Sequence, residues 1–230
     1  LEVAKIILFI FFLIHTHEYS VGMRKKMKRI IFATSNEGKM NEIKDILKDV
    51  DVKLMSLKDA GLHPDIVENG NTFEENAIIK AKTVMELTKE MVLADDSGIE
   101  VDYLDKAPGI YSARFLGENT PYTVKNQYIL DRLAQARGQE RSARFVCVIA
   151  CAFPDGKIIT TRGTVEGFIA DRISGERGFG YDPIFYVPEF GCTTAEMPEE
   201  QKNEISHRGR ALREMKKVII DNLDILPGES

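Results

Sequence analysis

Leu93-Ala94-Asp95-Asp96-Ser97-Gly98 is the stretch from which the fold of this chain is best inferred. An apolar run from Met91 to Ala94 leads directly into two carboxylates, a hydroxyl and a glycine. A short apolar strand that ends in acids predicts charge at a sheet edge, where ligands commonly bind in α/β proteins. Neighbouring strand residues point to opposite faces, so Asp95 and Asp96 need not share one role. Carboxylates suit Mg²⁺, and one can also accept a proton from water; a plain turn after a strand is the simpler alternative.

The composition is that of an ordinary globular protein. The chain has 230 residues, of which 43% are apolar and 29% charged, enough for one large domain or two small lobes. A net charge of -5 argues against a broad basic face, so we predict no nucleic-acid partner, although a local basic pocket for a nucleotide stays compatible. Three cysteines make neither a disulfide framework nor a four-ligand zinc site, which indicates buried thiols and a cytoplasmic location.

The N-terminal residues differ from the rest of the chain. Residues Ile6 to Ile14 are all apolar, but the run is far shorter than the ~20 residues needed to span a bilayer. Its length suits a secretory signal, yet no clear small-x-small cleavage site follows. We therefore expect residues 1–26 to be an extension upstream of a start at Met23 or Met27. We expect one folded unit over 27–226, with no membrane partner.

Hydrophobic periodicity predicts strands and helices that alternate through the first half of the chain. Thr72, with Glu75 three residues later, forms a capping box that predicts a helix start, and Pro154-Asp155-Gly156 predicts the turn of a long hairpin. This order of elements predicts an α/β fold with a mixed sheet. The expected strands cover 29–34, 53–56, 91 onward (continuing or turning back through 99–101), 144–153, 157–165 and 184–187. The expected helices cover 40–50, 72–89, 123–136, 198–205 and 206–223.

Residues Thr34 to Lys39 lie where the first strand becomes a helix. Backbone N–H groups at a helix start, small polar side chains and one lysine together suit a phosphate. The spacing differs from that of the P-loop, and a helix N-cap beside a solvated lysine is the alternative. Asn76 and Lys80 share one face of the next helix, which a solvated face would also explain.

Further polar groups fall at the ends of other expected elements. Three basic and three acidic side chains suit a triphosphate with its Mg²⁺; they are Lys39, Lys202, Arg208, Glu68, Asp95 and Asp96. In the glycine-rich loop that follows residue 175, Phe179 or Tyr181 can stack on a base, and Asp182 can accept a hydrogen bond from one.

Together these motifs resemble the non-canonical purine nucleoside triphosphate pyrophosphatases, also called the inosine triphosphate pyrophosphatase family. The resemblance covers about Lys28 to Leu223. It rests on Thr34-Ser-Asn-Glu-Gly-Lys39, Thr72-Phe-Glu-Glu-Asn-Ala77, Ala94-Asp-Asp-Ser-Gly98, Ala107-Pro-Gly-Ile-Tyr-Ser-Ala-Arg114, Gly178-Phe-Gly-Tyr-Asp-Pro-Ile-Phe185 and Ile205-Ser-His-Arg208.

The resemblance implies a two-lobed α/β fold with a long mixed sheet, an active-site cleft between the lobes, and a homodimer. It implies Mg²⁺-dependent hydrolysis of ITP, dITP and XTP to the monophosphate and pyrophosphate. It assigns Asp96 as the catalytic base, and Glu68 and Asp96 as metal ligands. The implied substrate contacts are Thr34, Ser35, Asn36, Glu37, Gly38, Lys39, Lys80, Ser97, Phe179, Gly180, Tyr181, Asp182, Lys202, His207 and Arg208.

Several alternatives stay open at this point. Asp95 is a further candidate metal ligand, and the basic residues are not divided between the phosphates and the base. A Maf-like pyrophosphatase would share the phosphate chemistry but have a different base pocket. A non-catalytic nucleotide sensor would be expected to lack one of the acids, and all are present. A membrane-tethered interaction protein would need Ile6 to Ile14 as its anchor.

Overall fold

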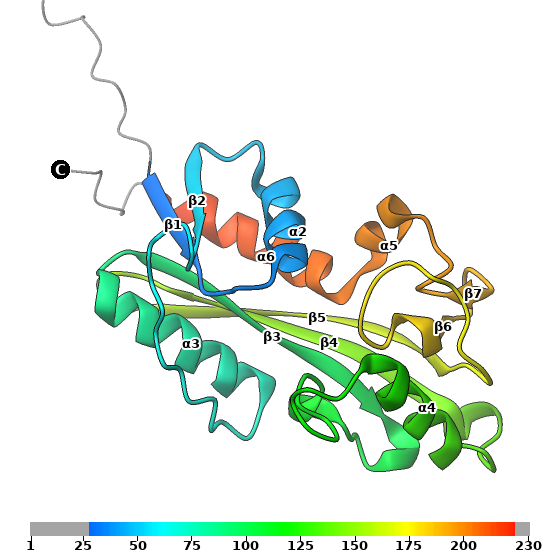
Figure 1. Ribbon diagram of the computed structural model, residues 1–230. Coiled ribbons are helices and arrows are strands. Elements are labelled where there is room, and N and C mark those ends of the chain that lie inside the picture. The colour runs from blue at the N-terminus through cyan, green and yellow to red at the C-terminus, as the bar shows by residue number, and fades with distance from the viewer. Residues whose placement is uncertain (1–27, 224–230) are drawn as a thin grey trace, which may run out of the picture.

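The computed structural model describes residues 28–223, so the expected extension at 1–26 lies outside the described residues. One seven-stranded sheet, in the order β2-β1-β3-β4-β5-β6-β7, runs through the molecule (Figure 1). Its strands are β1 (Lys28–Phe32), β2 (Val52–Ser56), β3 (Met91–Val101), β4 (Ser142–Ala152), β5 (Ile158–Ile169), β6 (Phe185–Val187) and β7 (Cys192–Thr193).

The sheet is mixed, as predicted. β1 pairs in parallel with both β2 and β3, and every later pairing is antiparallel. The expected hairpin forms between β4 and β5, where Gly156 adopts the positive φ of 90° that glycine tolerates in a tight turn. β5 continues to Ile169, past its expected end at Val165. β7 was not predicted, because two residues carry no periodicity.

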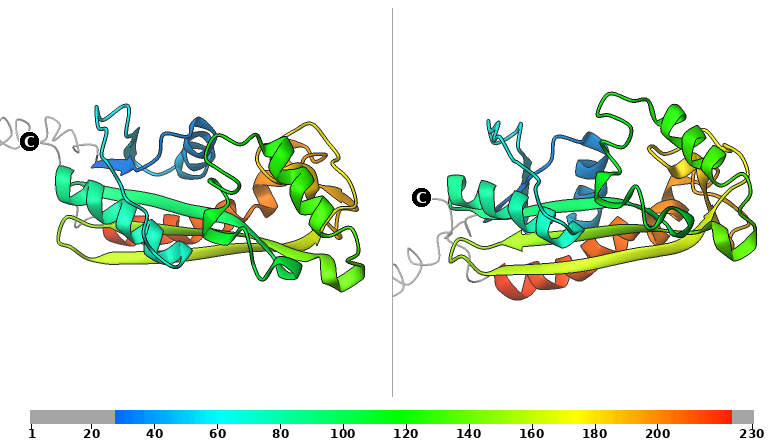
Figure 2. Two further views of the ribbon diagram at one scale, coloured as in Figure 1. Left: turned by 60° about the horizontal axis from the view of Figure 1, so that its bottom comes forward. Right: turned by 90° about the horizontal axis from the view of Figure 1, so that it is seen from below.

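Helices cover both faces of the long strands. They are α2 (Glu37–Leu47), α3 (Phe73–Thr88), α4 (Tyr122–Arg132), α5 (Glu199–Ile205) and α6 (His207–Asn222). Figure 2 shows α3 and α6 on opposite sides of β3, β4 and β5. Val92 and Ala94 pack toward α3, whereas Met91 and Leu93 pack with α2 and α6. β3 therefore contributes alternate residues to two separate cores.

β3 is longer than a short strand that ends in acids, and of the two alternatives for 99–101 the continuing strand is confirmed. It does not turn back, but continues through Asp95 and Asp96 to Val101. Its neighbour β1 stops earlier: the last residue of β1 that pairs with β3 is Phe32, which lies opposite Leu93. The two acids therefore lie in mid-strand, at the point where the sheet loses a neighbouring strand and a ligand gains access to β3.

The long strands connect two lobes. One lobe holds β1, β2, α2 and α3, and the other holds α4, α5, β6 and β7 around the far ends of β3, β4 and β5 (Figure 1). A third apolar cluster, which includes Ile129, Leu133 and Ile184, forms the core of this second lobe. Within residues 28–223, no helix is both long and apolar enough to cross a membrane.

Candidate active site

A cavity of about 690 Å³ opens between the two lobes. Most of the site residues predicted from the sequence line this cavity. Those on its wall are Thr34, Ser35, Asn36, Gly38, Lys39, Glu68, Lys80, Asp95, Ser97, Phe179, Gly180, Tyr181, Asp182, Lys202, His207 and Arg208. Two predicted residues are not on this wall: Glu37 lines a neighbouring hollow with Lys44, and Asp96 accepts a hydrogen bond from Lys80, which is on the wall.

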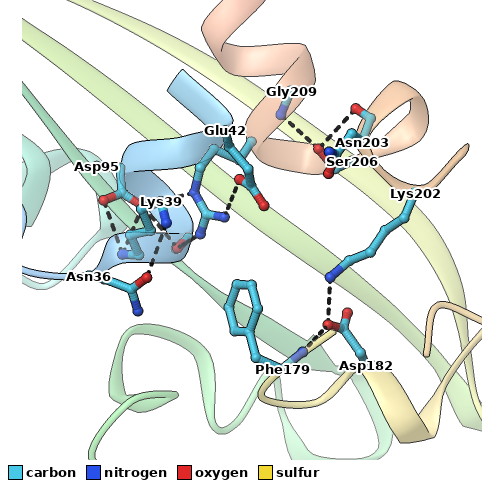
Figure 3. A network of polar contacts seen from close by, with 12 residues as sticks. Asn36, Lys39, Glu42, Asp95, Phe179, Asp182, Lys202, Asn203, Ser206 and Gly209 are labelled. Carbon is cyan, nitrogen blue, oxygen red and sulfur yellow. Dashed lines mark hydrogen bonds and ion pairs between the residues drawn. The ribbon is translucent and has the colours of Figure 1, made fainter. Parts of the chain in front are cut away.

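The predicted phosphate loop joins β1 to the start of α2. Asn36 caps the helix, since its Oδ1 accepts a hydrogen bond from the Lys39 N–H at 3.0 Å (Figure 3). The N terminus of α2 therefore faces the cavity with its partial positive charge. Lys39 is not the solvated lysine of the alternative interpretation, because its Nζ lies 2.9 Å from Asp95 Oδ2.

Asp95 is buried on the α2 and α6 side of β3, with 2% of its surface exposed. It accepts hydrogen bonds from Lys39 Nζ at 3.0 Å and Arg208 Nε at 3.3 Å. Burial opposes ionisation of Asp95, but Lys39, Arg208 and Lys80 outweigh it and hold the pKa well below the ordinary value. Asp95 is therefore a permanent anion that orders two cations.

Arg208 is buried at the first turn of α6. Its guanidinium donates from Nη1 to Glu42 Oε2 at 2.6 Å and from Nη2 to Ser97 Oγ at 3.1 Å, in addition to its bond with Asp95. Ser206 caps α6 by accepting from the Gly209 N–H at 2.8 Å (Figure 3). These contacts fix Arg208 at the cavity wall.

Asp96 faces the opposite side of β3, toward α3. Its Oδ1 accepts from Lys80 Nζ at 3.1 Å, and its Oδ2 accepts from Asn76 Nδ2 at 3.3 Å. Lys80 Nζ also lies 3.3 Å from Glu68 Oε2. Asn76 and Lys80 therefore do share one helix face, but that face is buried against the acids and is not the solvated face of the alternative interpretation.

Asp95 and Asp96 have opposite pKa shifts. Burial raises the pKa of Asp96 above its ordinary value; Lys80 and Asn76 oppose this shift, and Glu68 adds to it. A carboxyl whose pKa is raised is a better proton acceptor than an ordinary aspartate, whereas Asp95 is a poor one. Environments that separate two carboxyl pKa values in this way are typical of sites where the two groups have different roles.

The glycine-rich loop forms the other end of the cavity. Phe179 is 49% exposed, and Lys202 Nζ lies 4.8 Å from the centre of its ring. The buried Asp182 carboxylate accepts from the Phe179 N–H at 2.7 Å and Lys202 Nζ at 2.6 Å (Figure 3). It also accepts from Thr194 Oγ1 at 2.9 Å. Asp182 therefore holds the loop and Lys202 in place.

His207, the first residue of α6, also lines the cavity. Its ring stacks on Phe145, with ring centres 4.9 Å apart. Burial, together with the positive charges of Arg208 and Lys202, lowers the pKa of His207 well below its ordinary value. The imidazole is therefore neutral at pH 7 and can both donate and accept a hydrogen bond.

Known proteins are similar to this chain along most of its length. Residues 30–218 match the Ham1 family. A relative from Clostridium perfringens, named dITP/XTP pyrophosphatase, is 47% identical over 203 residues, which are 86% of this chain and 98% of the relative. The chain belongs to the Ham1 family. The resemblance inferred from the sequence is thereby confirmed.

Two solved structures of Ham1 proteins share the fold. A HAM1 protein from Coxiella burnetii has a TM-score of 0.79 and 41% identity, over 85% of this chain and all (100%) of that one. A Ham1 protein from Staphylococcus aureus has a TM-score of 0.78 and 42% identity, over 85% of this chain and 100% of that one. The predicted two-lobed α/β fold is thus that of the Ham1 family.

The predicted metal ligands of this Ham1 chain converge on one point. Glu68 and Asp96 each direct an oxygen at Lys80 Nζ, so the two carboxylates already face a shared positive charge. Among residues 28–223, no cluster of three or more His, Cys, Asp or Glu side chains forms a metal site. Mg²⁺ commonly takes one or two carboxylates together with waters and substrate phosphates, so the pair fits that ion.

Some residues of the site were missed by sequence reasoning. Glu42 binds Arg208, and its signal was its place one turn after Lys39 on the same face of α2. Tyr122 and Asn126, on α4, support the glycine-rich loop: Tyr122 packs edge-to-face on Tyr181 at 5.3 Å, and Asn126 Nδ2 donates to the Gly180 carbonyl at 3.1 Å. Nothing in the local sequence connects α4 with that loop.

Proposed function

We propose that this chain hydrolyses the non-canonical purine nucleoside triphosphates ITP, dITP and XTP to the monophosphate and pyrophosphate. One cavity combines a helix start and Lys39, which suit phosphates, with an exposed aromatic ring at Phe179, which suits a base. This combination occurs in a chain 47% identical to a protein named dITP/XTP pyrophosphatase. The cavity's two chemically different ends are the observation on which the proposal depends.

The proposed reaction is attack by water on the α-phosphorus. The bond from that phosphorus to the bridging oxygen breaks, pyrophosphate leaves, and Asp96 accepts the proton of the water. Mg²⁺, when bound by Glu68 and Asp96, would offset phosphate charge and lower the pKa of a bound water. Lys39 and the N–H groups of α2 stabilise the phosphates. Lys80 is close enough to both acids to orient them.

Base selection is proposed to depend on the 6-oxo pattern. Hypoxanthine and xanthine present N1–H as a donor and O6 as an acceptor, whereas adenine reverses both. The Asp182 oxygens already accept from three groups, so we assign Asp182 the indirect role of fixing Lys202 and Phe179. Lys202 and the neutral His207 are then the groups placed to meet O6 and N1–H.

We also propose that the protein is a cytoplasmic homodimer. The family resemblance supports the dimer, and the free thiols of Cys147, Cys151 and Cys192 suit a reducing compartment. Light scattering on the purified chain tests the dimer, and a monomer mass at micromolar concentration would contradict it.

The bond that is cleaved tests the proposed activity. ³¹P NMR of ITP incubated with the chain and Mg²⁺ should show inosine monophosphate and pyrophosphate as first products. Inosine diphosphate and phosphate would exclude the proposed reaction. Faster hydrolysis of UTP or dTTP than of ITP would favour a Maf-like specificity, and binding of ITP without products would indicate a sensor.

A further inference from the structure

Lys80 occupies an unusual position in the cavity. Its ammonium lies 3.1 Å from Asp96 Oδ1 and 3.3 Å from Glu68 Oε2, and only 9% of the residue is exposed. An ammonium held between two carboxylates at these distances stays charged, because each carboxylate stabilises its positive form. Lys80 and Glu68 line the cavity, and Asp96, which is not on its wall, accepts a hydrogen bond from Lys80. A positive charge therefore already covers the acid pair.

An ammonium and Mg²⁺ compete for this position. Mg²⁺ binds oxygen ligands at about 2.0–2.1 Å, closer than Lys80 Nζ lies to either carboxylate. The ion needs the same two oxygens, so it requires the carboxylates to move inward and the ammonium to leave. Two cations at that spacing also repel each other strongly where water is scarce. Simultaneous occupation of the pair is therefore unfavourable.

We propose that Lys80 is an internal cation that occupies the Glu68–Asp96 pair in the free protein and leaves it when a divalent cation arrives with a nucleotide. Lysine has a long flexible stem, and the cavity that it lines also receives Lys39 from the opposite side of β3. The phosphates of the substrate are the anions that take up the displaced ammonium. This inference rests on the proposed function and adds an order to it: the acid pair binds metal well only with nucleotide present.

The exchange also explains how Glu68 and Asp96 can lie close together beside the buried Lys80 when no metal ion is bound. Glu68 and Asp96 are like charges that both lie within 3.3 Å of Lys80 Nζ, so without a cation between them they repel each other. Lys80 offsets this repulsion in the free protein and becomes unnecessary there once a divalent cation is bound. Asn76 stays on the other oxygen of Asp96 in both states, because its own Oδ1 is held by the Gly70 N–H at 2.9 Å.

Binding of Mn²⁺ without nucleotide tests the exchange directly. Titration of the full chain, with free Mn²⁺ read by electron paramagnetic resonance, is compared for wild type, Lys80→Met and Lys82→Met. Lys82 is the matched control, since its side chain lies on the same helix and is 56% exposed. We expect Lys80→Met to bind Mn²⁺ at least about tenfold more tightly than the other two. Adding Glu68→Gln to Lys80→Met should abolish that gain.

Equal Mn²⁺ affinity in wild type and Lys80→Met would overturn the proposal. Should Lys80→Met fail to fold, the wild-type chain decides alone. Its melting temperature should not move with millimolar Mg²⁺, and should rise when a non-hydrolysable α,β-imido analogue of ITP is added with Mg²⁺. A rise with Mg²⁺ alone, as large as the rise with both, would contradict the exchange. Whether wild type hydrolyses ITP is measured separately, so failure of the proposed function is distinguishable.

Discussion

The two neighbouring carboxylates of β3 are the same amino acid in two different environments. Adjacent strand residues face opposite sides, so Asp95 meets Lys39 and Arg208, whereas Asp96 meets Lys80, Asn76 and the nearby Glu68. The alternation was predictable from the pair of letters Asp-Asp in a strand. The partners were not, because each comes from a helix distant in sequence.

Asp96→Asn should stop turnover while the protein stays folded. The amide keeps the shape of the side chain, although its contact with Lys80 is weaker. The proton acceptor and a metal ligand are lost, so kcat should fall ~10²-fold or more. Steady-state kinetics with ITP measure the effect, and circular dichroism controls for folding. Near-wild-type kcat in this variant would falsify the assignment of Asp96.

Asp95→Asn, in contrast to Asp96→Asn, should mainly lower the stability of the folded protein. The pKa of Asp95 is depressed from its ordinary value of 3.8, so its contribution to folding is complete at pH values well above 3.8 and is lost as pH falls through that value toward the lower, folded-state pKa. The variant leaves Lys39 and Arg208 without their buried anion and should lose about 3–5 kcal/mol at pH 7.

Urea unfolding between pH 7 and pH 3 measures this prediction. Wild type should lose stability on acidification more steeply than Asp95→Asn, because the variant has already lost the titrating group. Asp45→Asn is the control, since Asp45 has a 67% exposed side chain on the nearby helix α2. Identical slopes for wild type and Asp95→Asn would show that Asp95 does not contribute.

Lys39→Ala should raise KM for all triphosphates by a similar factor. Lys39 ends the predicted phosphate loop and lies at the helix-start end of the cavity, so it should contact phosphate and not base. KM values for ITP, XTP and ATP check this. A change confined to the ratio of ITP to ATP would contradict the phosphate-loop assignment.

At the scale of elements, the start of α6 depends on one glycine of β5. A Cβ on Gly163 would lie 2.1 Å from the His207 carbonyl oxygen and 2.7 Å from the Ala211 nitrogen, both backbone atoms. Gly163→Ala must therefore displace the turn that carries His207 and Arg208. We expect a loss of about 1–3 kcal/mol in stability and a lower kcat/KM for ITP.

Thr164→Ala is the control for that prediction, because residue 164 faces the other side of β5 and should change neither quantity much. Calorimetry and steady-state kinetics give the two readouts. Normal kcat/KM together with normal stability in Gly163→Ala would contradict the prediction, because it would mean that a Cβ fits between β5 and the start of α6.

Elements with local signals were the ones predicted well. Thr72 caps α3 and Asn36 caps α2, and both lie where strand or loop periodicity changes to helix periodicity. The boundaries of β5 and the existence of β7 were missed, since pairing with distant strands defines them. Gly163 gave no signal either, because a close approach to another backbone is a property of tertiary packing.

At the scale of the whole molecule, β3, β4 and β5 hold the two ends of the cavity in one rigid frame. The proposed phosphate end belongs to the lobe of β1, α2 and α3, and the proposed base end to the lobe of α4, α5 and the glycine-rich loop. The sequence resemblance predicted both the lobes and the cleft. The contacts that hold the glycine-rich loop within its lobe, such as Asn126 Nδ2 to the Gly180 carbonyl, required the structure.

Selectivity between bases tests the central claim most directly. kcat/KM for ITP, XTP, GTP and ATP is measured with pyrophosphate detection, using Asp96→Asn to correct for contaminating activity. A buried mismatch of donor and acceptor can reach ~10⁴-fold in kcat/KM, so ITP and XTP should exceed ATP by orders of magnitude. Equal kcat/KM for ITP and ATP would contradict the proposed function.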